Sequence, residues 1–344
     1  LKKLRKRIYA RIDADGIVLV SGKGKRKTPI QRLSEWIDQC LAKLKQYTKD
    51  IHICGNRNSF SKTDHDATFM HMKEDYMRNG QLKPGYNVNV ATCSDFIIGS
   101  YISSDRNDVH TLIPFMEQLR KNYAGRNIGS VVVDSGYESE ENYCWFEAHP
   151  ETELYVKPSN HEAAKHKKYR TDISRRENMA YDAQTDTYTC ANGKLLQKTR
   201  EKKTHTASGL EIATSVYECN ECDGCPLKEK CIRACGSKKP LKERHKVIYV
   251  SKRFARQRQA MEAKISSPKG CLLRVNRSIQ AEGNFAYVKQ DLDFRRFLLR
   301  GNMKVAAEWL LFSLALNILH LHHKIQNRRL GSGLKIPSSF PAGL

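Results

Sequence analysis

Two acidic residues far apart in the chain stand where a carboxylate could bind a metal ion. The first, Asp134, ends the apolar run Val131-Val132-Val133 in the stretch IGSVVVDSGYESEENY. A continuous run of β-branched residues predicts a strand covered on both faces, and α/β sheets place their ligands at the carboxyl ends of such strands. The alternative is that Asp134 caps a helix that follows it, and these residues alone favour neither interpretation.

The second acid, Glu282, lies in the stretch NRSIQAEGNFAYVKQ, which has helical spacing. In an α-helix, Phe285 at i+3 and Lys289 at i+7 lie on the same side as Glu282. The apolar residues Ile279, Phe285 and Val288 would pack this helix onto a sheet. An acid beside a packing face needs a cation or a metal ion, whereas Glu282 taken alone is interpreted more simply as an exposed side chain.

Cysteines form the third group with chemical potential. They are Cys190 and the closely spaced series Cys219, Cys222, Cys225, Cys231 and Cys235. A Cys-x2-Cys spacing lets two thiolates of one tight turn reach one Zn²⁺. We expect Cys219, Cys222, Cys225 and Cys231 to bind one structural Zn²⁺, with Cys190 as a replacement for one of them. The alternative is a set of reduced thiols in a partly ordered insert.

The charge of the chain indicates a polyanionic partner. The 344 residues include 60 Lys and Arg against 37 Asp and Glu, a formal net charge of +23 spread along the whole length. Such a chain is attracted to nucleic acid. The first twenty residues lack the apolar core of a secretory signal, and the apolar run 309–316 extends only to about 321 with interruptions, short of the roughly 18 residues that span a bilayer. We therefore expect a cytoplasmic protein with no membrane partner, in which that run is a buried core helix.

The predicted elements provide a frame for the acids. Two strands lie within 86–103, an amphipathic helix covers 108–124, and the valine strand is followed by a helix through Trp145 and by a strand in ELYVKPS. This order, β-β-α-β-α-β, is typical of a mixed sheet with helices packed on it. The regions are a basic helical segment (1–54), the first part of the core (55–158), a basic insertion with the cysteines (159–252), C-terminal helices that complete the core (253–325) and a disordered tail (326–344).

Several segments together resemble the C-terminal two-thirds of a bacterial insertion-sequence DDE transposase. They are NRNSFSKTDHDATFMHMKED, NGQLKPGYNV, VVVDSGYESEENY, YVKPSNHE, RRENMAYD, CPLKEKC and NRSIQAEGNFAYVKQDLDFRRFLLRG. The resemblance covers almost the whole chain. It implies an α/β, ribonuclease H-like mixed sheet flanked by helices, here interrupted by the basic Cys-rich insertion. It also implies metal-dependent DNA cleavage and strand transfer in transposition, a form of DNA recombination.

The resemblance assigns roles to individual residues. Asp134 matches the family's strand-ending Asp-x-Gly-Tyr, and Glu282 with Lys289 matches a helix acid followed by a basic residue seven positions on. Two Mg²⁺ ions about 3.5–4 Å apart, or Mn²⁺ in their place, would activate the attacking oxygen and stabilise the leaving one. Asp134 and Glu282 would each bind an ion, and Lys289 would hold a DNA phosphate.

Other features of the family are matched less closely. Related families place an Arg four residues before the Glu, where this chain has Ser278, and its Arg277 stands one step away. We assign a DNA-phosphate contact to Arg277 on that neighbouring position. The partners implied are the double-stranded element ends and target DNA, bound by a homodimer in the bacterial nucleoid.

The first acid of the family lies in an Asp-Gly-Thr strand before a helical insert. No comparable strand precedes the hairpin at 86–103, so we expect the first Asp upstream of Leu1, with Asp64 as the alternative. Two functions follow: the catalytic domain of a transposase, or a catalytically inactive DNA-binding fragment of one.

Overall fold

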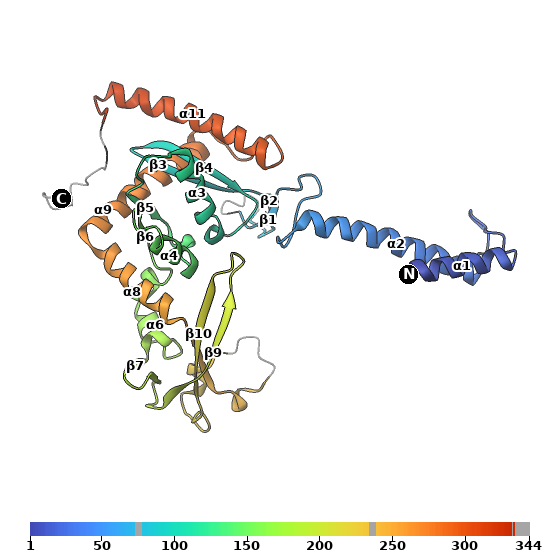
Figure 1. Ribbon diagram of the computed structural model, residues 1–344, viewed down its shortest axis with the longest axis horizontal. Helices are drawn as coiled ribbons and strands as arrows, with labels where there is room; N and C mark the ends of the chain where they lie inside the picture. Colours follow the sequence, from blue (N-terminus) through green and yellow to red (C-terminus); the bar gives the residue numbers. More distant parts are fainter. Residues whose placement is uncertain (73–77, 234–238, 332, 334–344) are drawn as a thin grey trace. The chain divides into compact units, whose positions relative to one another are not determined.

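A computed structural model describes residues 1–72, 78–233, 239–331 and 333. The chain divides into two compact units, the first made of Leu1–Tyr86, Ser104–Arg106 and Leu298–Val305, and the second of the remaining residues. Figure 1 shows their helices and strands. Cys235 and residues 334–344 of the predicted tail lie outside the described residues.

The first unit holds two helices and a short sheet. Helix α1 (Lys2–Ala14) packs on α2 (Pro29–Cys54) through Ile8, Ile12 and Ile37. Thr28 caps α2 by accepting a hydrogen bond from the N–H of Gln31, and proline at the first helical position suits that start. Strands β1 (Thr68–Met70) and β2 (Lys83–Gly85) pair antiparallel.

The second unit contains two two-stranded sheets around one apolar core. Strands β3 (Asn87–Cys93) and β4 (Phe96–Ser103) form an antiparallel hairpin, and β5 (Ser130–Val133) pairs in parallel with β6 (Glu153–Val156). Helices α3 (Leu112–Asn122), α4 (Glu140–Glu147) and α8 (Lys252–Ser266) contribute most of the buried side chains of that core, and both sheets pack against it. The α/β class is confirmed, although the four strands form two sheets where one mixed sheet was expected.

Strand β5 is less covered than its composition predicts. Its three valines are half-buried, so the expectation of a strand covered on both faces is wrong. The physical reason is pairing: among the described residues, β5 has a neighbouring strand on one edge only, β6. Strand β3 likewise pairs on one edge only, with β4.

The basic insertion folds as an antiparallel five-stranded sheet in the order β11-β10-β9-β8-β7. Its strands are β7 (Ala180–Asp182), β8 (Thr187–Thr189), β9 (Leu195–His205), β10 (Glu211–Cys219) and β11 (Lys246–Val250). Its small core contains the fully buried Leu196 and Tyr217, together with Ile248 and Val250. The Tyr217 hydroxyl donates a hydrogen bond to Asp186 Oδ1 at 2.7 Å in the β7–β8 turn.

A run of helices follows the insertion. Helix α8 meets α9 (Pro268–Arg277) so closely that a Cβ at Gly270 would lie 2.3 Å from the carbonyl oxygen of Lys264. The chain then passes through a π-helical turn (Ser278–Glu282), a short α10 (Gly283–Ala286) and a second π-helical turn (Tyr287–Asp291). The last helix is α11 (Asn302–Gln326).

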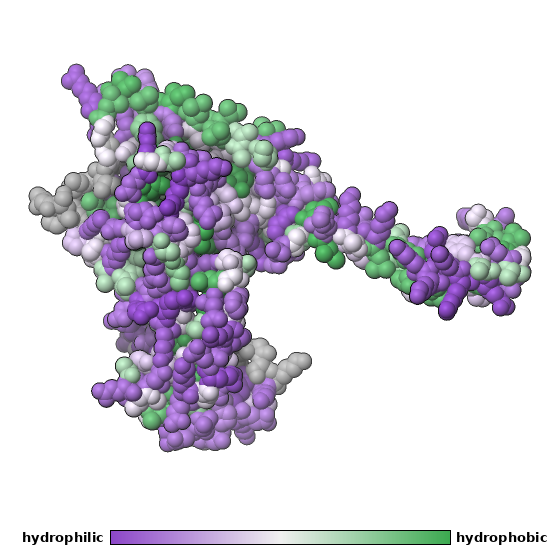
Figure 2. Space-filling model, viewed as in Figure 1, coloured by the Kyte–Doolittle hydropathy of each residue, from purple (hydrophilic) through white to green (hydrophobic). Residues whose placement is uncertain are grey.

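Helix α11 differs from the expected buried core helix. Trp309 and Leu316 pack against β3 and β4, and Asn317 hydrogen-bonds both backbone groups of Ile97. The opposite face is exposed and apolar, as Figure 2 shows along this helix. The helix is also longer than the apolar run suggested, and by length and composition alone it could cross a membrane. A single such helix is weak evidence for a membrane span, because core helices of other proteins share these properties.

Candidate functional site

Asp134 lies directly after β5, as the sequence predicts. Its Oδ1 accepts a hydrogen bond of 2.7 Å from the N–H of Gly136, which caps the short 3₁₀ turn Ser135–Tyr137. Helix α4 begins later and has its own cap, Ser139, which accepts from the N–H of Asn142. Asp134 therefore caps a turn and not the helix, and this uses one of its two oxygens.

A second carboxylate, which the sequence interpretation missed, lies beside Asp134. Asp108 begins the 3₁₀ turn before α3, and its Oδ1 accepts a hydrogen bond of 2.7 Å from Asn87 Nδ2 on β3. A Cβ added to Gly136 would lie 2.9 Å from both Asp108 Oδ2 and Asp134 Oδ1. The two carboxylates thus flank a glycine whose lack of a side chain permits their approach. In the sequence, Asp108 looks like an ordinary helix-starting Asp, so no local signal marks it.

Tyr137 connects this pair of acids to the hairpin. Its hydroxyl donates a hydrogen bond of 2.5 Å to the buried Asn89 Oδ1 on β3. Burial raises the pKa of Tyr137, the negative charges of Asp108 and Asp134 raise it further, and the positive charge of Arg277 partly opposes them. The hydroxyl therefore lies within electrostatic range of both acids and of Arg277.

Glu282 is held by its own helix. Arg277 Nη2 donates to Glu282 Oε1 at 2.7 Å, and the hydroxyl of Ser278 donates to Oε2 at 2.9 Å. The π-helical turn explains the first contact, because i→i+5 winding brings residues five apart next to each other. Arg277, one step from the family position, reaches Glu282 for this reason. The acid is satisfied by a cation here, with its side chain 60% exposed.

Lys289 lies in the second π-helical turn. Its expected position beside Glu282 assumed α-helical spacing, which the two π-helical turns interrupt. Phe285 and Val288 do pack in an apolar cluster with side chains of the β3–β4 sheet, as predicted, whereas Ile279 is 39% exposed and its predicted packing role is wrong. That Lys289 lines the same cleft as Asp134 stays a prediction.

The alternative first acid, Asp64, has protein partners for both oxygens. The Tyr86 hydroxyl donates to Oδ2 at 2.7 Å and the N–H of Gly301 to Oδ1 at 3.2 Å. Burial raises the pKa of Tyr86, and its hydrogen bond to Asp64 raises it further. Asp66 similarly accepts from the N–H of Asn302 at 2.8 Å. These acids join three segments of the first unit, which is a structural role.

The fit of a metal ion to the acids is partial. Asp108 and Asp134 supply neighbouring carboxylates, which suit Mg²⁺. Glu282, the expected partner, is engaged by Arg277 and Ser278. Within the part of the chain that the structure describes, no three Asp, Glu, His or Cys side chains are placed to hold a metal ion.

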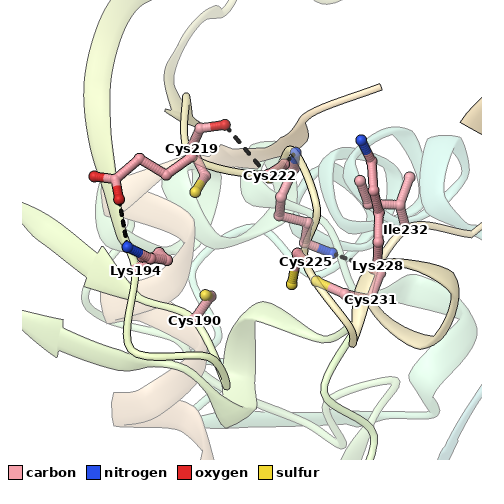
Figure 3. A pocket seen from close by; sticks show the side chains of 10 residues that line it. Cys190, Lys194, Cys219, Cys222, Cys225, Lys228, Cys231 and Ile232 are labelled. Atoms are coloured by element: carbon pink, nitrogen blue, oxygen red, sulfur yellow. Dashed lines mark hydrogen bonds and ion pairs between the residues drawn. The ribbon is translucent and has the colours of Figure 1, made fainter. Parts of the chain in front are cut away.

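The cysteines of the insertion gather at one small pocket with a cavity volume of about 20 Å³. Figure 3 shows it. Its lining consists of Cys190, Cys219, Cys222, Cys225 and Cys231 with Lys194, Glu221, Lys228, Ile232 and Lys246. The five cysteines are free thiols. Distant parts of the insertion therefore contribute sulfur to one place: the β8–β9 turn through Cys190, the end of β10 through Cys219, and the segment after β10 through Cys222, Cys225 and Cys231.

Burial affects the pKa of two of these thiols, Cys219 and Cys231. It raises the pKa of Cys219 to about 11. Burial also raises the pKa of Cys231, while Lys246 lowers it and the neighbouring Cys190, Cys222 and Cys225 raise it. Without a metal ion, the raised pKa values keep Cys219 and Cys231 as thiols at neutral pH. Lys246 also contributes through its backbone, whose N–H points at Cys222 Sγ at 3.3 Å.

Comparison with known proteins identifies the later part of the chain. Residues 189–322 match a family model described as a transposase DDE domain. The matched range contains every residue that lines the cysteine pocket, and it contains Arg277, Glu282 and Lys289, but not Asp134. No curated protein and no solved structure matches the chain. Over residues 189–322, the chain is therefore similar to transposase DDE domains.

Proposed function

We propose that this chain is the catalytic part of a bacterial insertion-sequence transposase with a ribonuclease H-like core, which cleaves DNA and transfers its strands. One observation carries the proposal: Asp134, at the end of β5, has a second carboxylate beside it, and the Tyr137 hydroxyl is within electrostatic range both of these acids and of Arg277, which binds Glu282. Acids at a strand end and on a late helix are the arrangement that metal-dependent phosphoryl transfer needs.

Asp134 and Asp108 would hold a Mg²⁺ or Mn²⁺ ion, and Glu282 is the further ligand expected. When bound, such ions activate an attacking oxygen and stabilise a leaving one. The chain's own residues position these acids. Gly136 allows the two Asp carboxylates to approach, and Arg277 holds Glu282 through the π-helical turn.

The two sheets of the second unit support the expected position of the first Asp. Strands β3 and β5 each lack a neighbour on one edge among the described residues. The two sheets share one apolar core, and Tyr137, just after β5, hydrogen-bonds Asn89 on β3. We infer that a strand from outside residues 1–344 pairs between β3 and β5 and brings the first Asp next to Asp134. This strand would also cover the half-buried valines of β5.

The substrate we propose is double-stranded DNA, both element ends and target, bound by a homodimer in the nucleoid. The net charge of +23 supports this, because phosphate contacts supply most nonspecific affinity. Lys289 and Arg277 would contact phosphate, and the Arg277–Glu282 pair would open to allow it. A structural Zn²⁺ at the cysteines completes the proposal. The second candidate, a catalytically inactive DNA-binding fragment, is favoured by the absence of three suitably placed acids in the described residues.

Nicking of a supercoiled plasmid that carries the element ends tests the proposal. The 344-residue chain should bind this DNA and cleave at background rate, whereas a protein extended upstream through an Asp-bearing strand should nick it with Mg²⁺ or Mn²⁺. Asp134→Asn and Glu282→Gln in the longer protein should abolish nicking and leave DNA binding intact. Glu151→Gln, at a surface ion pair with Arg120, is the matched control and should cleave normally. Nicking that survives Asp134→Asn would overturn the assignment.

A further inference from the structure

Five cysteines surround the pocket of the insertion, but tetrahedral Zn²⁺ takes four ligands. We propose that one Zn²⁺ is bound by Cys190, Cys222, Cys225 and Cys231, and that Cys219 is a core thiol outside the coordination shell. This inference rests on the zinc part of the proposed function and replaces one ligand of the set expected from the sequence. It is independent of whether the protein cleaves DNA.

The pocket has the composition of a metal site. Protein cores are normally filled by apolar side chains, yet Ile232 is the one aliphatic residue in this lining. The positive charges of Lys194, Lys228 and Lys246 surround the thiols and would favour thiolates over thiols. A divalent ion would stabilise the thiolates further, since cysteine binds zinc in the deprotonated form. The cavity volume of about 20 Å³ is enough for a single ion or water molecule.

Cys219 differs from the other four in its backbone. It is the last residue of β10, where the ladder pairs it with Lys246 of β11. It is 1% exposed and, like Cys222, belongs to the apolar core with Leu196 and Tyr217, so its place in the strand is what distinguishes it. The ladder with β11 holds its backbone in place.

The remaining four cysteines lie outside the strands, in turns and at the end of a short helix, so no strand ladder fixes their backbone. Cys190 is in the β8–β9 turn, Cys222 and Cys225 follow β10, and Cys231 ends α7 (Lys228–Cys231). In Figure 3, the sulfur atoms of Cys225 and Cys231 lie next to each other and that of Cys190 faces them from the other side.

Cys222 has a further property of a metal-bound sulfur. The backbone N–H of Lys246 points at its Sγ at 3.3 Å, and a hydrogen bond to the charged form favours that form. Its own S–H donates to the carbonyl oxygen of Cys219 at 3.5 Å, as a protonated thiol does. In the described residues, no three of these sulfurs already meet at a metal-binding point, so zinc binding requires rotation of the loop cysteines.

Zinc content measured by elemental analysis tests the ligand set. The 344-residue chain, purified without chelator from zinc-supplemented medium, should hold about one Zn²⁺, and so should Cys219→Ser. Separate Ser substitutions of Cys190, Cys222, Cys225 and Cys231 should lower the content to less than about half. Cys271→Ser, on α9, is the control and should keep the ion.

A second measurement covers the case in which the Cys190→Ser protein fails to fold. Cys190→His keeps a zinc-binding donor, so this variant should retain a metal ion. With Co²⁺ in place of Zn²⁺, its thiolate-to-cobalt absorption should be weaker and shifted relative to the wild type, whereas Cys219→Ser should match the wild type. A wild-type chain without zinc overturns the proposal. So does loss of zinc in Cys219→Ser with retention in Cys190→Ser. Neither result depends on strand cleavage.

Discussion

Replacing Arg258 by methionine should destabilise the second unit strongly, because it leaves the buried carboxylate of Glu138 without its positively charged partner. Glu138 follows the turn that carries Asp134, and its side chain is 1% exposed. Arg258, on α8, donates to its two oxygens through Nε and Nη2, each at 2.7 Å. The N–H of Ser159 and the hydroxyl of Tyr143 add bonds of 2.8 and 3.2 Å. One carboxylate thus joins the site turn, α4, α8 and the segment after β6.

The magnitude follows from burial. Removing one partner of a buried ion pair costs about 3–5 kcal/mol, since the remaining charge stays out of water. Arg258 retains 22% exposure, so we expect the lower end of this range. For a unit of about 150–250 residues, a loss of roughly 3 kcal/mol lowers the melting temperature by about 6–12 °C.

The same pair predicts a pH dependence. Burial raises the pKa of Glu138, but the hydrogen bonds and charge of Arg258 outweigh burial and hold this pKa below its usual range. A carboxyl group with a lowered pKa stabilises the fold above its unfolded pKa of about 4.3, and the stabilisation is lost as pH falls through the folded value. The difference between wild type and Arg258→Met should therefore be full at pH 7 and shrink below about pH 4.

Urea denaturation followed by tryptophan fluorescence at several pH values measures both effects. Lys269→Met is the matched control, because Lys269 and Glu153 form an ion pair of 2.8 Å with 59% and 44% of their side chains exposed. Exposed pairs contribute about 0–1 kcal/mol, so this variant should unfold almost like wild type. Equal losses in the two variants, or a loss in Arg258→Met that does not change with pH, would refute the reasoning.

Three further outcomes are expected. Duplex DNA binding by this chain of +23 charge should weaken steeply with salt, by about 0.9 in log–log slope for each neutralised phosphate, and equal affinity at two salt concentrations would contradict it. Gly136→Ala should push the two Asp carboxylates apart and slow nicking by the longer protein about 10²-fold, whereas Gly129→Ala, with open space at its Cβ, should not. Burial raises the pKa of Asp186, but hydrogen bonds from Lys252 and two tyrosines lower it to about 2. The stability that Asp186→Asn removes at pH 6 should therefore vanish as pH falls from about 4 to 2, which acid titration of unfolding measures.

Local patterns in the sequence predicted much of the core. The hairpin at 86–103, the amphipathic helix after it and the valine strand all lie where periodicity indicates, because side-chain spacing within one element reports its backbone. The burial of a strand or helix depends instead on residues distant in the sequence that pack against it. The valines of β5 and the apolar face of α11 were both expected to be buried, yet their exposure is determined by which strand or helix packs against them.

The candidate site was predictable only in part, for a geometric reason. Asp134 was found because a strand-ending acid is a local feature. Asp108 and Cys190 were harder, since each gains its significance from residues brought near by the fold. The Arg277–Glu282 contact depends on π-helical winding, which periodicity based on 3.6 residues per turn does not anticipate.

One inserted strand would account for three separate features of the second unit. A strand paired between β3 and β5 would occupy both edges that have no neighbour among the described residues. It would cover the valines, whose β-branched composition suits a central strand but whose half-burial in this structure does not. Its carboxyl end would lie next to Asp134, where a third acid is needed. On this proposal, the same strand completes both the sheet and the set of acids. The proposal predicts that an upstream extension which restores DNA strand cleavage also protects the β5 amides from hydrogen exchange. Cleavage without that protection would contradict it.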